Sequence, residues 1–111
     1  MATTMPDSAK GAVKDHSTRV LARFTGAPSV TTEKYDECIK RLKASGAQWP
    51  PDGLAYHVAF SSGGSFRVSE IWDSREQFDV FGKRLMPVLN DLGIELAGEP
   101  EMLKVHNIIE R

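Results

Sequence analysis

The sequence predicts an α+β fold, because segments with the two-residue period of strands alternate with segments that have the 3.6-residue period of helices. The clearest observation is a pair of alternating apolar runs at residues 54–60 and 66–72, joined by a short turn that contains Gly-Gly. The second observation is an amphipathic helical stripe on each side of that hairpin. With one more strand at each end, the order becomes strand, helix, strand, strand, helix, strand, which is typical of a ferredoxin-like βαββαβ sandwich.

The first strand and first helix occupy residues 19–46. Residues 19–24 alternate, and one side of the extended chain carries Val20, Ala22 and Phe24. The helix begins at Thr31 or Thr32, since either hydroxyl can accept a hydrogen bond from a free backbone amide. Its apolar residues recur at helical spacing, at Tyr35, Cys38, Ile39 and Leu42. Gly46 is expected to end it.

The hairpin brings the residues of chemical interest together. With its turn centred on the two glycines of residues 61–65, His57 faces Glu70 and Ala55 faces Trp72. An imidazole, a carboxylate and an indole are then expected on one face of the sheet. A register shifted by one residue would separate His57 from Glu70. The opposite face of the first hairpin strand is apolar, with Leu54, Tyr56, Val58 and Phe60.

The second helix and last strand complete the domain. Ser74 and Gln77 match a capping box at the start of a helix over residues 74–92. Its buried stripe consists of Phe78, Phe81, Leu85, Val88 and Leu92. The β-branched content of residues 102–109 predicts the final strand, and residues 94–100 hold either a short extra strand or a loop.

The strand order follows from the handedness of the two crossovers. Right-handed connections place the first and third strands in the centre, with the second and fourth at the edges, and put both helices on one face. The other face also carries apolar residues, which a second copy of the chain would bury. We therefore expect a homodimer; the alternative is a monomer with one solvated sheet face.

Composition limits the class of protein. The chain has 111 residues and a net charge of −1, which suits one domain and gives no field that favours nucleic acid or an acidic membrane. We expect a flexible tail at residues 1–17 and a single domain at residues 18–111. No apolar run is long enough for a membrane span, and the N-terminus lacks the apolar centre of a signal peptide. A cytoplasmic protein is the simplest expectation. The single cysteine, Cys38, excludes an internal disulfide and a Cys-rich zinc site.

Residues 70–78, EIWDSREQF, resemble the strand-to-helix junction of the antibiotic biosynthesis monooxygenase family, which often carries Glu-x-Trp-x-Ser-x-x-x-Phe at this point. The likeness extends over residues 20–109. It implies a dimeric α+β barrel in which two ferredoxin-like sheets pack together, with a ligand cavity between helices and sheet in each subunit. The family includes cofactor-free oxygenases of polyketide phenols, haem-degrading oxygenases and proteins without known activity, so the resemblance indicates fold more than function.

The haem-degrading branch does not fit this sequence. The resemblance matches its Trp at Trp72, but that branch also needs a haem-ligating His on the following helix and an Asn on the first strand. Residues 74–92 contain no His, and residues 19–24 contain no Asn. Because a proximal His normally holds the iron, we expect no haem and, more generally, no cofactor.

The candidate catalytic residues are His57 and Glu70. A carboxylate beside an imidazole selects its tautomer and raises its basicity, so the pair can take a proton from a phenol or an activated carbon acid. Trp72 is expected to form a flat apolar wall for an aromatic substrate, and Tyr35 and Phe81 are candidate substrate-binding residues. The simpler interpretation is a cross-strand His–Glu pair that satisfies two polar groups.

The remaining candidates are weaker. His106 on the last strand is interpreted as a partly exposed edge residue, and no metal site is expected because the possible ligands lie on separate strands. Trp49, in the Pro-rich loop, forms either a lid or a packed loop. The sequence and the family resemblance together indicate a small-molecule-binding protein, and the resemblance implies a cofactor-free monooxygenase of a small aromatic or polyketide-like substrate as the preferred activity. The alternatives are a non-catalytic ligand-binding or interaction protein, and a cofactor-free isomerase or cyclase.

Overall fold

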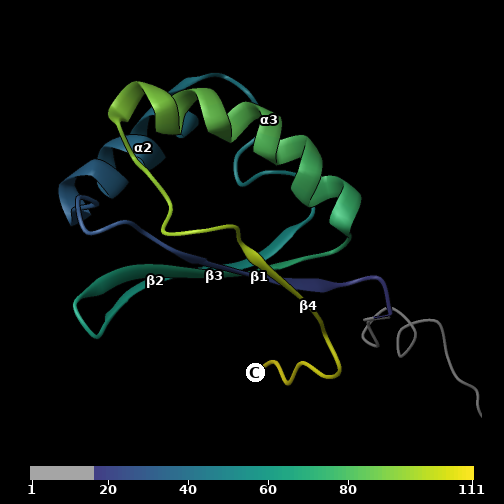
Figure 1. Ribbon diagram of the computed structural model, residues 1–111. Helices are drawn as coiled ribbons and strands as arrows, with labels where there is room; N and C mark the ends of the chain where they lie inside the picture. Colours follow the sequence, from purple (N-terminus) through teal and green to yellow (C-terminus); the bar gives the residue numbers. More distant parts are fainter. Residues whose placement is uncertain (1–16) are drawn as a thin grey trace, which may run out of the picture.

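The computed structural model describes residues 17–111, so the tail expected at residues 1–17 lies outside them except for Ser17. Two helices cover one face of a single sheet (Figure 1). In chain order the elements are β1 (Val20–Thr25), α2 (Thr32–Ala44), β2 (Leu54–Ser62), β3 (Ser65–Trp72), α3 (Arg75–Leu92) and β4 (Glu101–Lys104). The predicted ferredoxin-like α+β fold is therefore confirmed. None of the helices within residues 17–111 combines the length and apolar character that a membrane span requires.

The strands are ordered β2-β3-β1-β4, and every neighbouring pair is antiparallel. This is the predicted order, with the first and third strands in the centre. Both helices lie on the same face of the sheet, as right-handed crossovers require (Figure 1). The cavity described below lies between these two layers.

The hairpin register is the predicted one from the turn to Tyr56, and it pairs His57 with Glu70. The predicted pairing of Ala55 with Trp72 is wrong. A β-bulge lies between Leu54 and Tyr56, so Trp72 pairs with Leu54 instead. The extra residue turns the Leu54 side chain toward the helices, where it packs against the core. The period-two pattern predicted Leu54 on the same face as Tyr56, and the bulge reverses that assignment.

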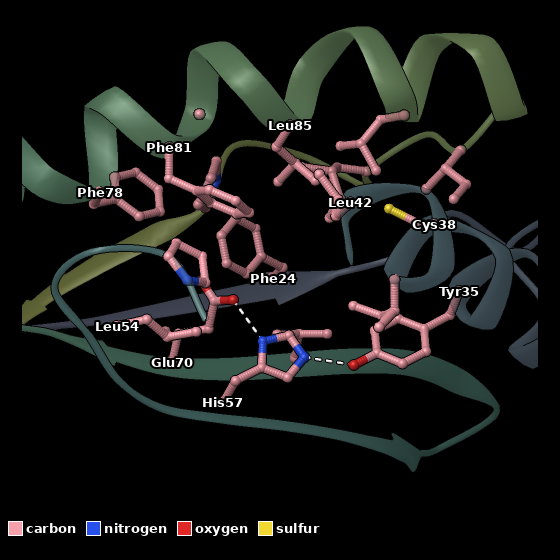
Figure 2. Close-up of a pocket in the computed structure, with 18 of the residues that line it drawn as sticks. Phe24, Tyr35, Cys38, Leu42, Leu54, His57, Glu70, Phe78, Phe81 and Leu85 are labelled. Atoms are coloured by element: carbon pink, nitrogen blue, oxygen red, sulfur yellow. Dashed lines mark hydrogen bonds and ion pairs between the residues drawn. The ribbon is translucent and has the colours of Figure 1, made fainter. Parts of the chain in front are cut away.

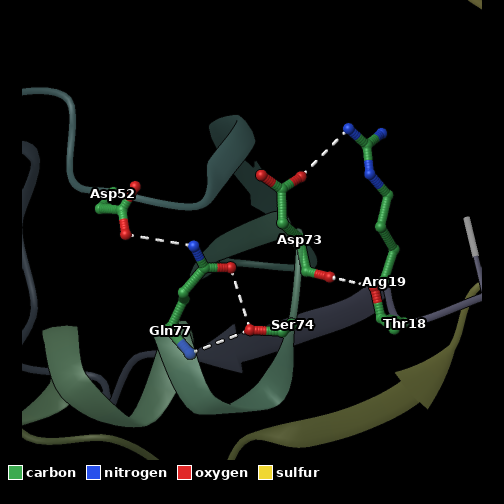
Figure 3. A network of polar contacts seen from close by, with 6 residues as sticks. All are labelled: Thr18, Arg19, Asp52, Asp73, Ser74 and Gln77. Atoms are coloured by element: carbon green, nitrogen blue, oxygen red, sulfur yellow. Dashed lines mark hydrogen bonds and ion pairs between the residues drawn. The ribbon is translucent and has the colours of Figure 1, made fainter. Parts of the chain in front are cut away.

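The helix caps stabilise the junctions that carry the site. The Thr31 hydroxyl accepts from the backbone N–H of Lys34 at 3.1 Å at the start of α2. At the start of α3 the Ser74 hydroxyl accepts from the backbone N–H of Gln77 at 3.2 Å (Figure 3). The Gln77 side chain differs from a standard capping box: its oxygen accepts from the Ser74 hydroxyl, and its amide donates to Asp52 at 3.1 Å. Gly93 then ends α3 in the left-handed conformation.

A further pair of contacts holds the end of β3 to the start of β1. Arg19 forms a 3.1 Å ion pair with the Asp73 carboxylate, and the Thr18 hydroxyl donates to the Asp73 backbone oxygen at 2.8 Å (Figure 3). Together with the Gln77–Asp52 bond, they hold β1, β3, α3 and the loop before β2 in one arrangement. The residues at the C-terminal end of β3 therefore have a well-supported backbone.

The core lies between the sheet and the helices. Its buried members come from both layers: Ala22, Cys38, Leu42, Trp72, Phe81 and Leu89. The face of the sheet away from the helices, called here the open face, carries Tyr56 and Phe60 with 55% and 38% of their surfaces exposed. Ile108 and Ile109, after β4, border a hollow beside Tyr56. The expected homodimer would use the open face and stays a prediction.

The last strand is shorter than predicted. β4 ends at Lys104, which pairs with Val20, the first residue of β1. Because β1 begins at Val20, it has no earlier strand residue that could pair with residues 105–109, and these residues do not extend the sheet. His106 is consequently an exposed residue outside the strand. Residues 94–100 form a loop with one isolated bridge, between Leu96 and Gly26.

Candidate functional site

A cavity of about 800 Å³ lies between the sheet and the two helices. Its wall is almost entirely apolar, and aromatic rings supply much of it: Phe24, Tyr35, Trp49, Phe66, Phe78 and Phe81 (Figure 2). Polar side chains reach the wall mainly at one place, where His57 and Glu70 of the sheet meet Tyr35 of α2. The shape suits a small, largely apolar molecule whose polar group meets that cluster. The cavity implied by the family resemblance is therefore present.

Three hydrogen bonds join four side chains across the sheet and α2. The Tyr35 hydroxyl lies 2.6 Å from His57 Nε2, and His57 Nδ1 lies 2.6 Å from Glu70 Oε2 (Figure 2). On the far side of the carboxylate, the Trp72 indole N–H donates to Glu70 Oε1 at 2.9 Å. We call this set, Tyr35–His57–Glu70–Trp72, the relay chain. It runs from the cavity wall into the core.

The chemistry of the donors determines the tautomer of His57. An indole N–H can only donate, so Glu70 Oε1 is an acceptor. Glu70 Oε2 accepts from His57 Nδ1–H, as a carboxylate beside an imidazole does. In the neutral ring, the lone pair is then on Nε2, and it faces the Tyr35 hydroxyl. The Glu70 side chain is only 8% exposed and that of His57 is 25% exposed, so these bonds have little competition from water.

Burial raises the pKa of the Tyr35 hydroxyl above its usual value of 10.0, and the nearby Glu70 carboxylate raises it further, with smaller effects of Asp36 and Cys38. Tyr35 is therefore a neutral phenol at physiological pH, and its O–H donates to the lone pair of His57 Nε2. Both ring nitrogens of His57 already have partners within the protein.

Trp72 does not have the position expected of a substrate wall. It is 0% exposed and is absent from the residues that line the cavity. Its ring packs edge-on against Phe78, with centroids 5.9 Å apart, and tilted against Phe81 at 5.5 Å. The expected contact with an aromatic substrate is therefore wrong, because the indole fills the core behind Glu70. Its polar atom instead holds Glu70 in place.

The other predicted substrate-binding residues, Tyr35 and Phe81, do line the cavity. Cys38 also lines it, and burial raises the pKa of its thiol although the nearby Arg41 acts in the opposite direction. The Tyr35–His57 bond was not foreseen, since the sequence indicated only that Tyr35 belongs to the apolar stripe of a helix. A polar atom on that stripe is the one signal that could have suggested a buried partner.

Trp49 is part of the cavity wall, and the structure shows what holds it. The Arg84 guanidinium lies 5.9 Å from the centre of the Trp49 ring and 5.5 Å from that of Phe81. The same group donates to the backbone oxygens of Gln48 at 2.8 Å and Leu42 at 3.1 Å. Trp49 is thus fixed to α3 as a wall of the cavity, so a packed loop describes it better than a free lid.

His106 does not reach the relay chain, being exposed after the end of β4. Across residues 17–111, no three His, Cys, Asp or Glu side chains are grouped as metal ligands would be. The residues that the structure describes contain a hydrogen-bonded tyrosine–histidine–glutamate cluster at the wall of an apolar cavity. A carboxylate-paired imidazole of this kind has the chemistry of a general base.

Comparisons with known proteins agree with this architecture. A solved structure of SnoaB, a cofactor-independent oxygenase from Streptomyces nogalater, superposes with a TM-score of 0.54 at 15% identity over 84% of this chain and 96% of that one. A Caulobacter crescentus protein provisionally named as an antibiotic biosynthesis monooxygenase gives a TM-score of 0.53 at 18% identity, over 80% of this chain and 89% of that one. A Nitrosomonas europaea protein of unknown function gives 0.51 at 17% identity, over 87% of this chain and 96% of that one.

At these identities the comparisons define a class by fold. The chain has the ferredoxin-like fold of antibiotic biosynthesis monooxygenase-like proteins, as the residues at the β3–α3 junction indicated. No protein-family model and no curated protein sequence matches it. What the chain does must therefore be argued from its own cavity and relay chain.

Proposed function

We propose that this protein binds a small phenolic, polyketide-like aromatic molecule and oxygenates it as a cofactor-independent monooxygenase, with His57 as the base. The observation that carries the proposal is the relay chain at the wall of an apolar cavity. Glu70 orients His57 and balances its positive charge when it takes a proton. The fold shared with SnoaB, a cofactor-independent oxygenase, adds support.

The reaction balances without a cofactor. The enol form of an activated CH₂ group loses its O–H proton, and His57 gains one proton at Nε2. The electron pair left on the substrate is delocalised to a ring carbon that bears hydrogen, and this carbon adds molecular oxygen. The peroxide takes the proton back and loses water, so a CH₂ group becomes a carbonyl: one oxygen atom enters the product and the other leaves as water. An apolar cavity favours the step because it excludes competing water.

The proposal includes a cytosolic homodimer. The support for a dimer is the open face, where large apolar side chains are exposed on β2. Two exposed sheet faces packed together would bury them and leave the cavity, on the other side of each sheet, available to a ligand.

A hydroxylated anthrone, which has an activated CH₂ between phenolic rings, is a suitable probe. We expect the purified protein to consume oxygen with this probe and to form the corresponding anthraquinone. His57→Ala should lower the rate by about 10²–10⁴-fold, the usual contribution of a general base. Ser61→Ala, at the exposed turn end of β2, is the matched control and should retain the rate. Unchanged turnover in His57→Ala would remove His57 from the mechanism.

The non-catalytic alternative has one observation in its favour: both nitrogens of His57 are already bonded within the protein. Binding of the probe without oxygen uptake or any change in its spectrum would favour a ligand-binding protein. An isomerase or cyclase would use the same base, and conversion of a phenolic substrate without oxygen uptake would identify it.

A further inference from the structure

Tyr35 separates the base from any bound molecule. Its hydroxyl lies 2.6 Å from His57 Nε2, the only ring nitrogen that can act as a base once Nδ1 donates to Glu70. A substrate proton cannot reach the Nε2 lone pair directly unless Tyr35 moves away. The oxygen of Tyr35, by contrast, has a second lone pair and can accept a hydrogen bond while its own hydrogen stays on Nε2.

We propose that Tyr35 is a catalytic residue that relays the substrate proton to His57, an inference that rests on the function proposed above. The substrate O–H bond breaks as its proton bonds to Tyr35 Oη. In the same step the Tyr35 O–H bond breaks, and that proton bonds to His57 Nε2. The substrate becomes an anion, His57 becomes an imidazolium, and Tyr35 is a neutral phenol before and after.

This route agrees with the charges around Tyr35. A tyrosinate would be unfavourable there, because the hydroxyl is half-buried and the Glu70 carboxylate is close. The relay needs no tyrosinate, since one proton arrives as another leaves. The positive charge develops on His57, against the nearly buried carboxylate that already accepts from it. After transfer, the imidazolium donates to Tyr35 and Tyr35 donates to the substrate anion.

The rings around Tyr35 hold it in the required position. The Tyr35 and His57 rings are inclined by only 18° with centroids 5.9 Å apart, and Phe66 packs against Tyr35 at 5.1 Å. α2 thus supplies the end of the path that meets the substrate, and the other members of the path lie on β2 and β3 (Figure 2). The substrate group that meets this path is an O–H, a phenol or an enol, which can donate to Tyr35 at ordinary hydrogen-bond length.

The decisive variant is Tyr35→Phe, assayed with the hydroxylated anthrone under anaerobic conditions. Absorbance of the deprotonated probe reports proton transfer alone, without the oxygen step. The relay predicts that this rate falls about 100-fold or more. Direct transfer to His57 predicts an unchanged or faster rate, because the substitution frees Nε2, and that result would overturn the proposal. Ser61→Ala, at the exposed turn end of β2 and outside the cavity wall, is the control and should leave the rate unchanged.

A second measurement separates a proton path from a structural role. The chain has two tyrosines, so 3-fluorotyrosine incorporated into the Tyr56→Phe protein marks Tyr35 alone. If Tyr35 lies in the path, its more acidic fluorinated phenol should change the rate of proton transfer. The solvent isotope effect on that rate should also change, because two protons move in the same step. An isotope effect that depends linearly on deuterium content would contradict the relay. This test holds even where Tyr35→Phe fails to fold.

Failure of the relay and failure of the proposed function give different results. If His57→Ala abolishes oxygen uptake and Tyr35→Phe does not, the oxygenase stands and the relay is wrong. If the natural sequence neither deprotonates the probe nor consumes oxygen with it, the proposed function and the relay are both overturned.

Discussion

The indole N–H of Trp72 donates to one oxygen of Glu70 at 2.9 Å, and the other oxygen of that carboxylate lies 2.6 Å from His57 Nδ1. Glu70 therefore has a donor on each oxygen, one from the core and one from the cavity wall. This arrangement explains why a carboxylate can remain buried on an otherwise apolar sheet face, and it makes the tautomer of His57 depend on a residue that the substrate never touches.

Glu70→Gln should reverse the tautomer of His57. The indole N–H needs an acceptor, so the amide oxygen takes the place next to Trp72 and the amide NH₂ faces His57 Nδ1. Nδ1 must then carry the lone pair, and Nε2–H donates to Tyr35. We expect ¹⁵N NMR of the imidazole to show this change, and turnover to fall by about 10²–10⁴-fold.

The natural protein is the control for that spectrum, with Nδ1 protonated and Nε2 unprotonated in the neutral ring. If Glu70→Gln leaves the ¹⁵N shifts of His57 as they were, Glu70 does not select the tautomer, and its role is reduced to that of a buried hydrogen-bond acceptor.

Trp72→Phe should destabilise the protein by about 1–3 kcal/mol through the unsatisfied Glu70 oxygen alone, with a further loss from the smaller ring. Trp72 is fully buried and packs against Phe78 and Phe81. Urea unfolding followed by circular dichroism measures the effect. Trp49→Phe, on the partly buried cavity wall, is the matched control and should cost less. Equal losses in the two variants would show that the bond to Glu70 contributes nothing.

Stability should fall as pH rises through about 10 because of Tyr35. Folding raises the pKa of this phenol above its ordinary value of 10.0, first by burial and then through Glu70. The folded state therefore keeps its proton at a pH where the unfolded chain has lost it. The resulting stabilisation is complete below pH 10 and is lost above it, as the pH rises toward the folded-state pKa. Denaturant midpoints between pH 8 and pH 11 measure this loss.

Tyr35→Phe is the control for the pH dependence, because it removes this titrating group and should reduce the slope above pH 10, while the slope from the buried Cys38 thiol, whose pKa is also raised, remains. The exposed Tyr56 remains in that variant, so any residual slope belongs to other groups. An identical slope with and without the Tyr35 hydroxyl would contradict the assignment.

The protein should be a dimer that Phe60→Glu separates. Phe60 lies on the open face, where a charge would have to be buried between two sheets. Light scattering after size exclusion should give twice the chain mass for the natural sequence and the chain mass for the variant, with unchanged circular dichroism. Val80→Glu, on the outer side of α3 where Val80 is 68% exposed, should stay dimeric. A monomeric natural protein would show that the open face is solvated.

Much of the fold could be predicted because it depends on local periodicity. The order of elements, the Thr31 and Ser74 caps and the strand order follow from hydrophobic spacing, short polar signals and crossover handedness. The Ala55–Trp72 pairing and the length of the last strand were predicted wrongly, because both depend on contacts with other parts of the sheet. The bulge serves the packing of Leu54, and β4 ends where β1 begins.

The sequence by itself determined that His57 and Glu70 face each other, because a tight turn and a two-residue period set the register of adjacent strands. Only the tertiary structure decided which residues that pair contacts. The packing of α2 on the sheet brings Tyr35 onto His57 Nε2, and the packing of α3 covers Trp72 so that its N–H serves Glu70 rather than a ligand. These contacts join elements far apart in the chain, and no local pattern specifies them.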